Sequence, residues 1–188
     1  MDIRIHHRKN SILIDPIGRS RYNNLGGDDI DRDLAVFLLA CWEYESECTL
    51  TDLKPDIRKE LYRLFLKKAE AFKVEVEERI AEGMELNEFV IQETLEGDPP
   101  LTVSFRRNMP KELYDEVTGR YFQERSDVNI YRPIGQAIAV AQEIHPTFTE
   151  KKLNLILFTG GASRMAAVGA ALVSRNSNIR RSEDELSL

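Results

Sequence analysis

The chain contains little cysteine and no long apolar run. Of its 188 residues, Cys41 and Cys48 are the only cysteines, and both lie in or near one predicted helix. Such a pair favours reduced thiols in a cytoplasmic protein over a disulfide framework. No segment approaches the roughly 18–20 consecutive apolar residues of a membrane-spanning helix, so we expect no membrane among its partners.

Basic charge is also scarce relative to acidic charge. The chain has 26 Lys and Arg against 32 Asp and Glu, a formal net charge of −6. A protein built mainly to hold nucleic acid is usually basic, so we expect no nucleic acid partner, although a local basic patch is compatible with this composition. The apolar content of 42% is ordinary for a globular protein, and the length suffices for one domain or two small ones.

Two glycines separate a predicted strand from a predicted helix in Leu153–Met165, which reads LNLILFTGGASRM. An apolar run of this length is typical of a strand that is buried on both faces of a parallel sheet. Ligands of open α/β sheets lie at the carboxyl ends of the strands, where Gly160 and Gly161 have no Cβ to obstruct a close approach. Arg164 would lie in the next helical turn, and its flat guanidinium can stack on an aromatic ring. The plain alternative is a tight turn that serves packing alone.

The rest of the pattern predicts a mixture of strands and helices. In chain order we expect two short strands, a helix after two glycines, a long helix, a hairpin and two further helices. They lie at residues 1–7, 11–15, 28–42, 55–83, 89–105, 109–121 and 133–144.

Three aspartates, Asp28, Asp29 and Asp31, lie at the start of the first predicted helix. Asp28 or Asp29 can cap this helix, and the helix dipole favours acids there without any metal, so we expect no metal site.

Apolar residues at helical spacing predict the buried faces of this helix and of the long one. They are Ile30, Leu34, Phe37, Leu38 and Cys41 in the first helix, and Ile57, Leu61, Leu64, Phe65, Phe72 and Val76 in the long one.

Both ends of the chain indicate a piece of a longer protein. The first residues, MDIRIHH, already alternate as a strand does, and residues 174–188 are polar and contain no further core element. We therefore expect more sequence on both sides.

Three stretches together resemble one family. NNLGGDDIDRDL, KKAEAFKVEVE and LNLILFTGGASRM are similar, in order and rough spacing, to parts of the nucleotide-binding domain of seventy-kilodalton heat-shock chaperones of the DnaK type. The resemblance covers nearly the whole chain and implies an α/β fold, the second lobe of an actin-like ATPase. Residues 1–25 and 121–188 would form a ribonuclease-H-like sheet subdomain, and residues 26–120 a smaller α/β subdomain inserted into it.

The resemblance also implies roles for particular residues. In the family, adenosine lies between the two subdomains of this lobe, and helix residues contact the ribose and adenine while a glycine turn lies under the base. The residues that match nucleotide-binding positions are Glu70, Lys73, Gly160, Gly161, Ala162, Arg164 and Asp184. The implied cofactor is ATP or ADP, with magnesium only in the full-length parent. The implied partners are the remainder of the ATPase domain, a nucleotide exchange factor and a J-domain co-chaperone.

The chain departs from the family in ways that affect activity. Glu77 stands where the family usually has a serine that contacts adenine, and Ala162 replaces a more usual polar residue. We expect the Glu77 carboxylate to be paired with Arg164 or Lys73, or to be solvated. The phosphate-binding turns of the family are not in this sequence, so the chain alone should bind nucleotide weakly and have no catalytic residues.

Three interpretations therefore stay open. The chain is the adenosine-binding half of a chaperone-type ATPase domain, or a lobe of a bacterial actin-like protein or sugar kinase, which share the fold. The third interpretation, a non-catalytic interaction module of the actin fold that has lost nucleotide binding, is favoured by Glu77 and Ala162. The helix that carries Glu70 and Lys73 favours the chaperone interpretation over the second.

Overall fold

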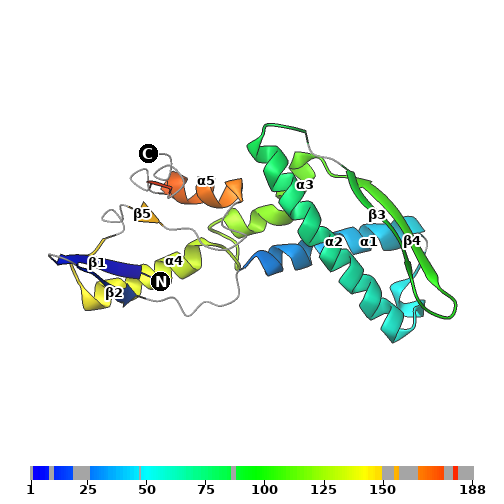
Figure 1. Cartoon of the computed structure of the whole chain (residues 1–188), viewed down its shortest axis with the longest axis horizontal. Coiled ribbons are helices and arrows are strands. Elements are labelled where there is room, and N and C mark those ends of the chain that lie inside the picture. Colours follow the sequence, from blue (N-terminus) through cyan, green and yellow to red (C-terminus); the bar gives the residue numbers. More distant parts are fainter. Residues whose placement is uncertain are drawn as a thin grey trace. The chain divides into compact units, whose positions relative to one another are not determined.

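A computed structural model describes residues 2–8, 11–18, 26–46, 48–85, 88–149, 155–156, 165–175 and 180–181. The chain forms two compact units, which we call unit 1 (residues 1–26 and 121–188) and unit 2 (residues 27–120). Helices and two-stranded sheets occur in both units (Figure 1), so the chain belongs to the α/β class.

Unit 2 consists of helices and one antiparallel hairpin. Its elements are α1 (Gly27–Ser46), η1 (Leu50–Asp52), α2 (Pro55–Ala81), β3 (Glu88–Leu95), β4 (Leu101–Asn108) and α3 (Lys111–Thr118), followed by the start of η2 (Gly119–Phe122). The predicted long helix and the predicted hairpin are thereby confirmed. The hairpin turn lies against the start of α2, because Lys54 Nζ donates a hydrogen bond of 2.6 Å to the carbonyl oxygen of Asp98.

The core of unit 2 is built around Phe65 of α2. Its ring centroid lies 6.1 Å from that of Trp42 on α1 and 5.9 Å from that of Phe105 on β4. The helical spacing of α2 and the alternation of the two strands bring these apolar side chains to one face each. The fully buried apolar residues include Leu34, Leu38, Leu61, Phe65, Ala69, Val76, Ile91, Val103 and Met109. Phe37 and Cys41, which were also expected in the core, are partly buried at its margin.

A glycine ends α2. Gly83 has φ of 70°, a left-handed conformation that glycine adopts without steric cost. The amide of Met84 then donates a hydrogen bond of 2.9 Å to the carbonyl oxygen of Arg79, which satisfies an otherwise unpaired carbonyl of the last helical turn.

Unit 1 holds the remaining elements. They are β1 (Asp2–Arg8), β2 (Ser11–Gly18), α4 (Tyr131–Ile144), β5 (Leu155–Ile156), α5 (Ala166–Arg175) and β6 (Arg180–Arg181). The strands β1 and β2 pair antiparallel, with Ile5 opposite Ile14, whereas β5 and β6 pair parallel. The hydroxyl of Tyr131 donates a hydrogen bond of 3.3 Å to the carbonyl oxygen of Ala171, which joins α4 to α5.

Two predicted helix starts are wrong. Helix α1 begins at Gly27, so Asp28 and Asp29 lie in its first turn and do not cap it. Helix α4 begins at Tyr131, two residues before Pro133, because the side chain of Asn129 accepts hydrogen bonds of 3.0 Å from the amides of Tyr131 and Arg132. These bonds satisfy amides that the first helical turn leaves without a helical partner.

Candidate functional site

The polar centre of unit 2 is a buried lysine on α2. Lys73 lies on the buried stripe of α2, next to Phe72 and one helical turn from Ala69, and its side chain is 9% exposed. Its Nζ lies 2.7 Å from Oδ1 of Asp31 and 2.8 Å from Oδ2, and it also donates a hydrogen bond of 3.3 Å to the carbonyl oxygen of Gly27. The ammonium group therefore joins α2 to the first turns of α1.

The partner carboxylate is as deeply buried as the lysine. The side chain of Asp31 is 7% exposed, and both of its carboxylate oxygens lie against the ammonium group of Lys73, from which Oδ2 accepts a hydrogen bond. Burial raises the pKa of Asp31, Lys73 opposes that rise, and the carboxylates of Glu70 and Asp28 add to it. The lysine therefore offsets only part of the cost of burying this anion.

A second polar contact joins α3 to α2. The hydroxyl of the buried Tyr114 donates a hydrogen bond of 3.0 Å to Oε1 of Glu77, and the hydroxyl of Thr118 donates one of 2.9 Å to the carbonyl oxygen of Tyr114. Burial, together with the adjacent Glu77 carboxylate, raises the pKa of Tyr114 far above its ordinary value. The Glu77 side chain is half-buried and accepts this bond from Tyr114, a partner that we did not expect, whereas the expected partner Arg164 lies outside the described residues.

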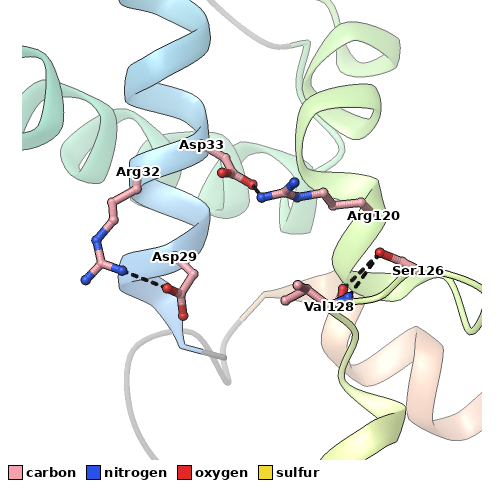
Figure 2. Close-up of polar contacts among 6 residues, drawn as sticks. All are labelled: Asp29, Arg32, Asp33, Arg120, Ser126 and Val128. Carbon is pink, nitrogen blue, oxygen red and sulfur yellow. Dashed lines mark hydrogen bonds and ion pairs between the residues drawn. The ribbon is translucent and has the colours of Figure 1, made fainter. Parts of the chain in front are cut away.

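Ion pairs support the same helix start at its surface. Figure 2 shows Arg32 and Asp29 of α1, whose Nη1 and Oδ1 lie 2.8 Å apart, and the ion pair of Asp33 with Arg120. The second pair joins α1 to η2. In contrast to Asp31, these carboxylates are partly accessible to solvent, so each pair contributes little to stability.

Figure 2 also contains a local turn of unit 1. The hydroxyl of Ser126 donates a hydrogen bond of 3.1 Å to the carbonyl oxygen of Val128 and accepts one of 3.4 Å from the amide of the same residue. Both contacts lie within three residues of chain, so they stabilise the turn itself.

The structure describes two of the predicted nucleotide-binding residues. Lys73 is buried in the ion pair, and Glu70 lies exposed on α2, close enough to Asp31 to raise its pKa. The other five predicted residues lie outside the described part of the chain. They are Gly160, Gly161, Ala162, Arg164 and Asp184. The nucleotide site as a whole therefore stays a prediction.

Asp31 was not expected to be the partner of Lys73. A signal was present, because Asp31 lies on the apolar stripe of α1 between Ile30 and Leu34, and Lys73 lies on the stripe of α2 beside Phe72. A charged residue on each of two buried helix faces indicates that the two charges compensate each other.

The described residues contain few groups for other chemistry. Among them, no three His, Cys, Asp or Glu side chains are grouped so that they could hold a metal ion. None of the described helices is long and apolar enough to cross a membrane. What the described polar residues offer is an exposed carboxylate, Glu70, one helical turn from an ammonium group that two oxygen partners hold in place.

No protein-family model matches this chain, and no curated protein matches it at a significant level. The resemblance to the chaperone family therefore rests on the three sequence stretches described above.

Proposed function

We propose that this chain is the adenosine-binding lobe of a chaperone-type ATPase domain of the actin-like fold, and part of a larger cytoplasmic, ATP-dependent protein-folding chaperone. Its ligand is ATP or ADP, with magnesium bound only in the full-length parent. Its partners are the remainder of the ATPase domain and, by family resemblance, a nucleotide exchange factor or a J-domain co-chaperone.

The observation that carries the proposal is the fixed ammonium group of Lys73 beside the exposed carboxylate of Glu70. A buried lysine is costly, and Asp31 together with the carbonyl oxygen of Gly27 holds it in one orientation. A carboxylate and an ammonium group at this spacing can bind the hydroxyl groups of a ribose, because the carboxylate accepts hydrogen bonds and the ammonium group donates them. The arrangement of the chain also supports the proposal, since unit 2 is one continuous stretch between two segments of unit 1.

The proposed adenine contacts come from the other matching residues. Gly160, Gly161 and Ala162 would allow the base to approach the backbone, Arg164 would stack on it, and Asp184 would lie near the pocket. This chain lacks the phosphate-binding turns of the family. Its affinity for adenosine should therefore nearly equal its affinity for ATP, with a dissociation constant of roughly 0.1–1 mM or weaker.

A second candidate is a non-catalytic interaction module of the same fold. One observation favours it: Lys73 is bound to Asp31 and Gly27, and Glu77 to Tyr114, so two side chains near the expected ligand already have partners within unit 2. In that case the buried pair serves folding alone, and the lobe presents its surface to another protein.

Calorimetric titration with adenosine and with ATP distinguishes the two candidates. We expect Glu70→Gln to weaken adenosine binding about tenfold, since a neutral amide accepts weaker hydrogen bonds from ribose hydroxyls. Glu78→Gln is the matched control, because Glu78 is an exposed carboxylate two turns further along the same helix. Equal effects of the two variants, or no binding by the parent chain at millimolar ligand, would favour the interaction module.

A further inference from the structure

The helix α2 carries its charges in an unusual order along its length. Residues 55–68 of this helix contain five basic and two acidic residues, and residues 69–81 contain two basic and four acidic ones. A helix dipole favours the opposite order, with acids near the N-terminus and bases near the C-terminus. Each half of α2 therefore carries the less favourable charge, and the stability of the helix itself does not account for the pattern.

The exposed residues of α2 form one continuous ridge. We define the ridge by six residues, each separated from the next by three or four positions, so that they follow one another along a single face of the helix. They are Lys59, Arg63, Lys67, Glu70, Val74 and Glu78, all of them exposed. The ridge is basic at one end and acidic at the other, and its length is about 28 Å at 1.5 Å per residue.

The ridge is complementary to a second copy of itself. When two such helices pack antiparallel about a two-fold axis, Lys59 of one copy lies opposite Glu78 of the other, and Lys67 lies opposite Glu70. Arg63 then lies opposite Val74, which is 51% exposed and can be covered by the aliphatic part of the arginine side chain. Each contact occurs twice because the interface is symmetric.

The two end residues of the ridge, Lys59 and Glu78, are not engaged with other charges among the described residues of unit 2. Within the part of the chain that the structure describes, neither Lys59 nor Glu78 forms an ion pair, whereas Arg63 pairs with Glu60 at 2.5 Å and Glu75 with Arg79 at 3.1 Å. Lys59 and Glu78 therefore bind a partner without first breaking a contact.

We propose that the α2 ridge is a self-association surface, through which two copies of this chain pair antiparallel by charge complementarity. The proposal does not rest on nucleotide binding, although Glu70 belongs both to the ridge and to the proposed adenosine site. A single helix pair is a small interface, and exposed ion pairs are weak, so the dimer should form at about 0.1 mM protein at low ionic strength and dissociate as salt screens the charges.

Sedimentation of the full chain tests this proposal by charge reversal. We expect Lys59→Glu and Glu78→Lys each to raise the dimer dissociation constant about tenfold, because each places like charges opposite one another at two symmetric contacts. The double variant restores opposite charges, so its dissociation constant should return to within about threefold of the parent value. Circular dichroism establishes that each variant is folded.

Matched controls carry the same charge changes away from the ridge. Arg125→Glu and Glu116→Lys alter exposed residues outside α2 and should leave the dissociation constant unchanged. The proposal is overturned if the parent chain stays monomeric at about 1 mM and about 0.02 M salt. It is equally overturned if the double variant is no stronger than the single ones, or if the controls weaken the dimer as much as the ridge variants do. Nucleotide binding is measured separately, so either proposal can fail alone.

Discussion

Removal of the lysine should destabilise unit 2 far more than neutralisation of its partner. In Lys73→Met the Asp31 carboxyl stays buried near Glu70 and Asp28, both of which disfavour its ionised form. In Asp31→Asn no anion is buried, and the amide oxygen can still accept a hydrogen bond from the ammonium group of Lys73. The two variants remove the same ion pair, but only the first leaves an uncompensated buried anion.

The magnitude follows from protonation of Asp31. Without Lys73 the buried carboxyl takes up a proton on folding, which costs about 1.4 kcal/mol for each pH unit above an unfolded pKa of about 3.9. At pH 7 this cost reaches about 4 kcal/mol, and the relieved burial of the ammonium group offsets part of it. We therefore expect Lys73→Met to lower the free energy of unfolding by about 2–4 kcal/mol at pH 7, and Asp31→Asn to lower it by less than half as much.

The free energy of unfolding of Lys73→Met should also depend on pH in a characteristic way. A carboxyl whose pKa is raised by folding binds more protons in the native state, so its stabilising contribution is complete below the unfolded pKa and is lost as the pH rises through the folded one. In the parent chain the pKa of Asp31 is raised, but Lys73 limits the rise. The stability that is lost with rising pH is therefore lost over a narrower range, which ends at a lower pH than in Lys73→Met. In Lys73→Met the free energy of unfolding continues to fall to higher pH, with a slope that approaches about 1.4 kcal/mol per pH unit.

Urea denaturation at several pH values measures this effect. Trp42 is the single tryptophan and lies 2% exposed in the core of unit 2, so its fluorescence reports the unfolding of this unit. Lys67→Met, which removes an exposed lysine from the same helix, should change stability by less than about 0.5 kcal/mol. The reasoning is refuted if Asp31→Asn destabilises as much as Lys73→Met at neutral pH, or if the two variants have the same pH slope.

Three further predictions concern the core and the activity. Tyr114→Phe removes the hydrogen bond to Glu77 and should lower the free energy of unfolding by about 1–2 kcal/mol in urea denaturation; an unchanged midpoint would contradict the contact. Phe65→Ala should cost about 3–5 kcal/mol by the same measurement, whereas Val90→Ala, at a residue that is 46% exposed, should cost less than about 0.5 kcal/mol. The purified chain should release no phosphate from ATP above background, and a turnover that Arg164→Ala abolishes would contradict this prediction.

The elements of unit 2 could be predicted from local periodicity. Leu61, Phe65, Phe72 and Val76 recur at helical spacing and are all buried in α2, because a helix with one apolar stripe must cover that stripe. The hairpin likewise followed from two apolar strands around a turn rich in glycine and proline. These patterns depend on residues a few positions apart, so the sequence alone contains the information.

The polar contacts could not be predicted in the same way. Asp31 and Lys73 are 42 positions apart, and Glu77 and Tyr114 are 37 apart, so their pairing depends on how the helices pack. Local pattern could not identify the partner of the Tyr114 hydroxyl, because that partner lies on another helix. The predicted start of α1 was wrong for a different reason: aspartates favour both the cap and the first turn of a helix, so local pattern does not distinguish the two positions.

The most direct test of the proposed function is a titration of the isotope-labelled chain with adenosine, observed by NMR. We expect the backbone amides of Glu70, Lys73 and Gly160 to shift with one common dissociation constant of roughly 0.1–1 mM or weaker, and with nearly the same value for ATP. An affinity for ATP far above that for adenosine would show that this chain contacts the phosphates as well. The absence of shifts at these residues, at adenosine concentrations of about 10 mM, would contradict the adenosine-binding proposal.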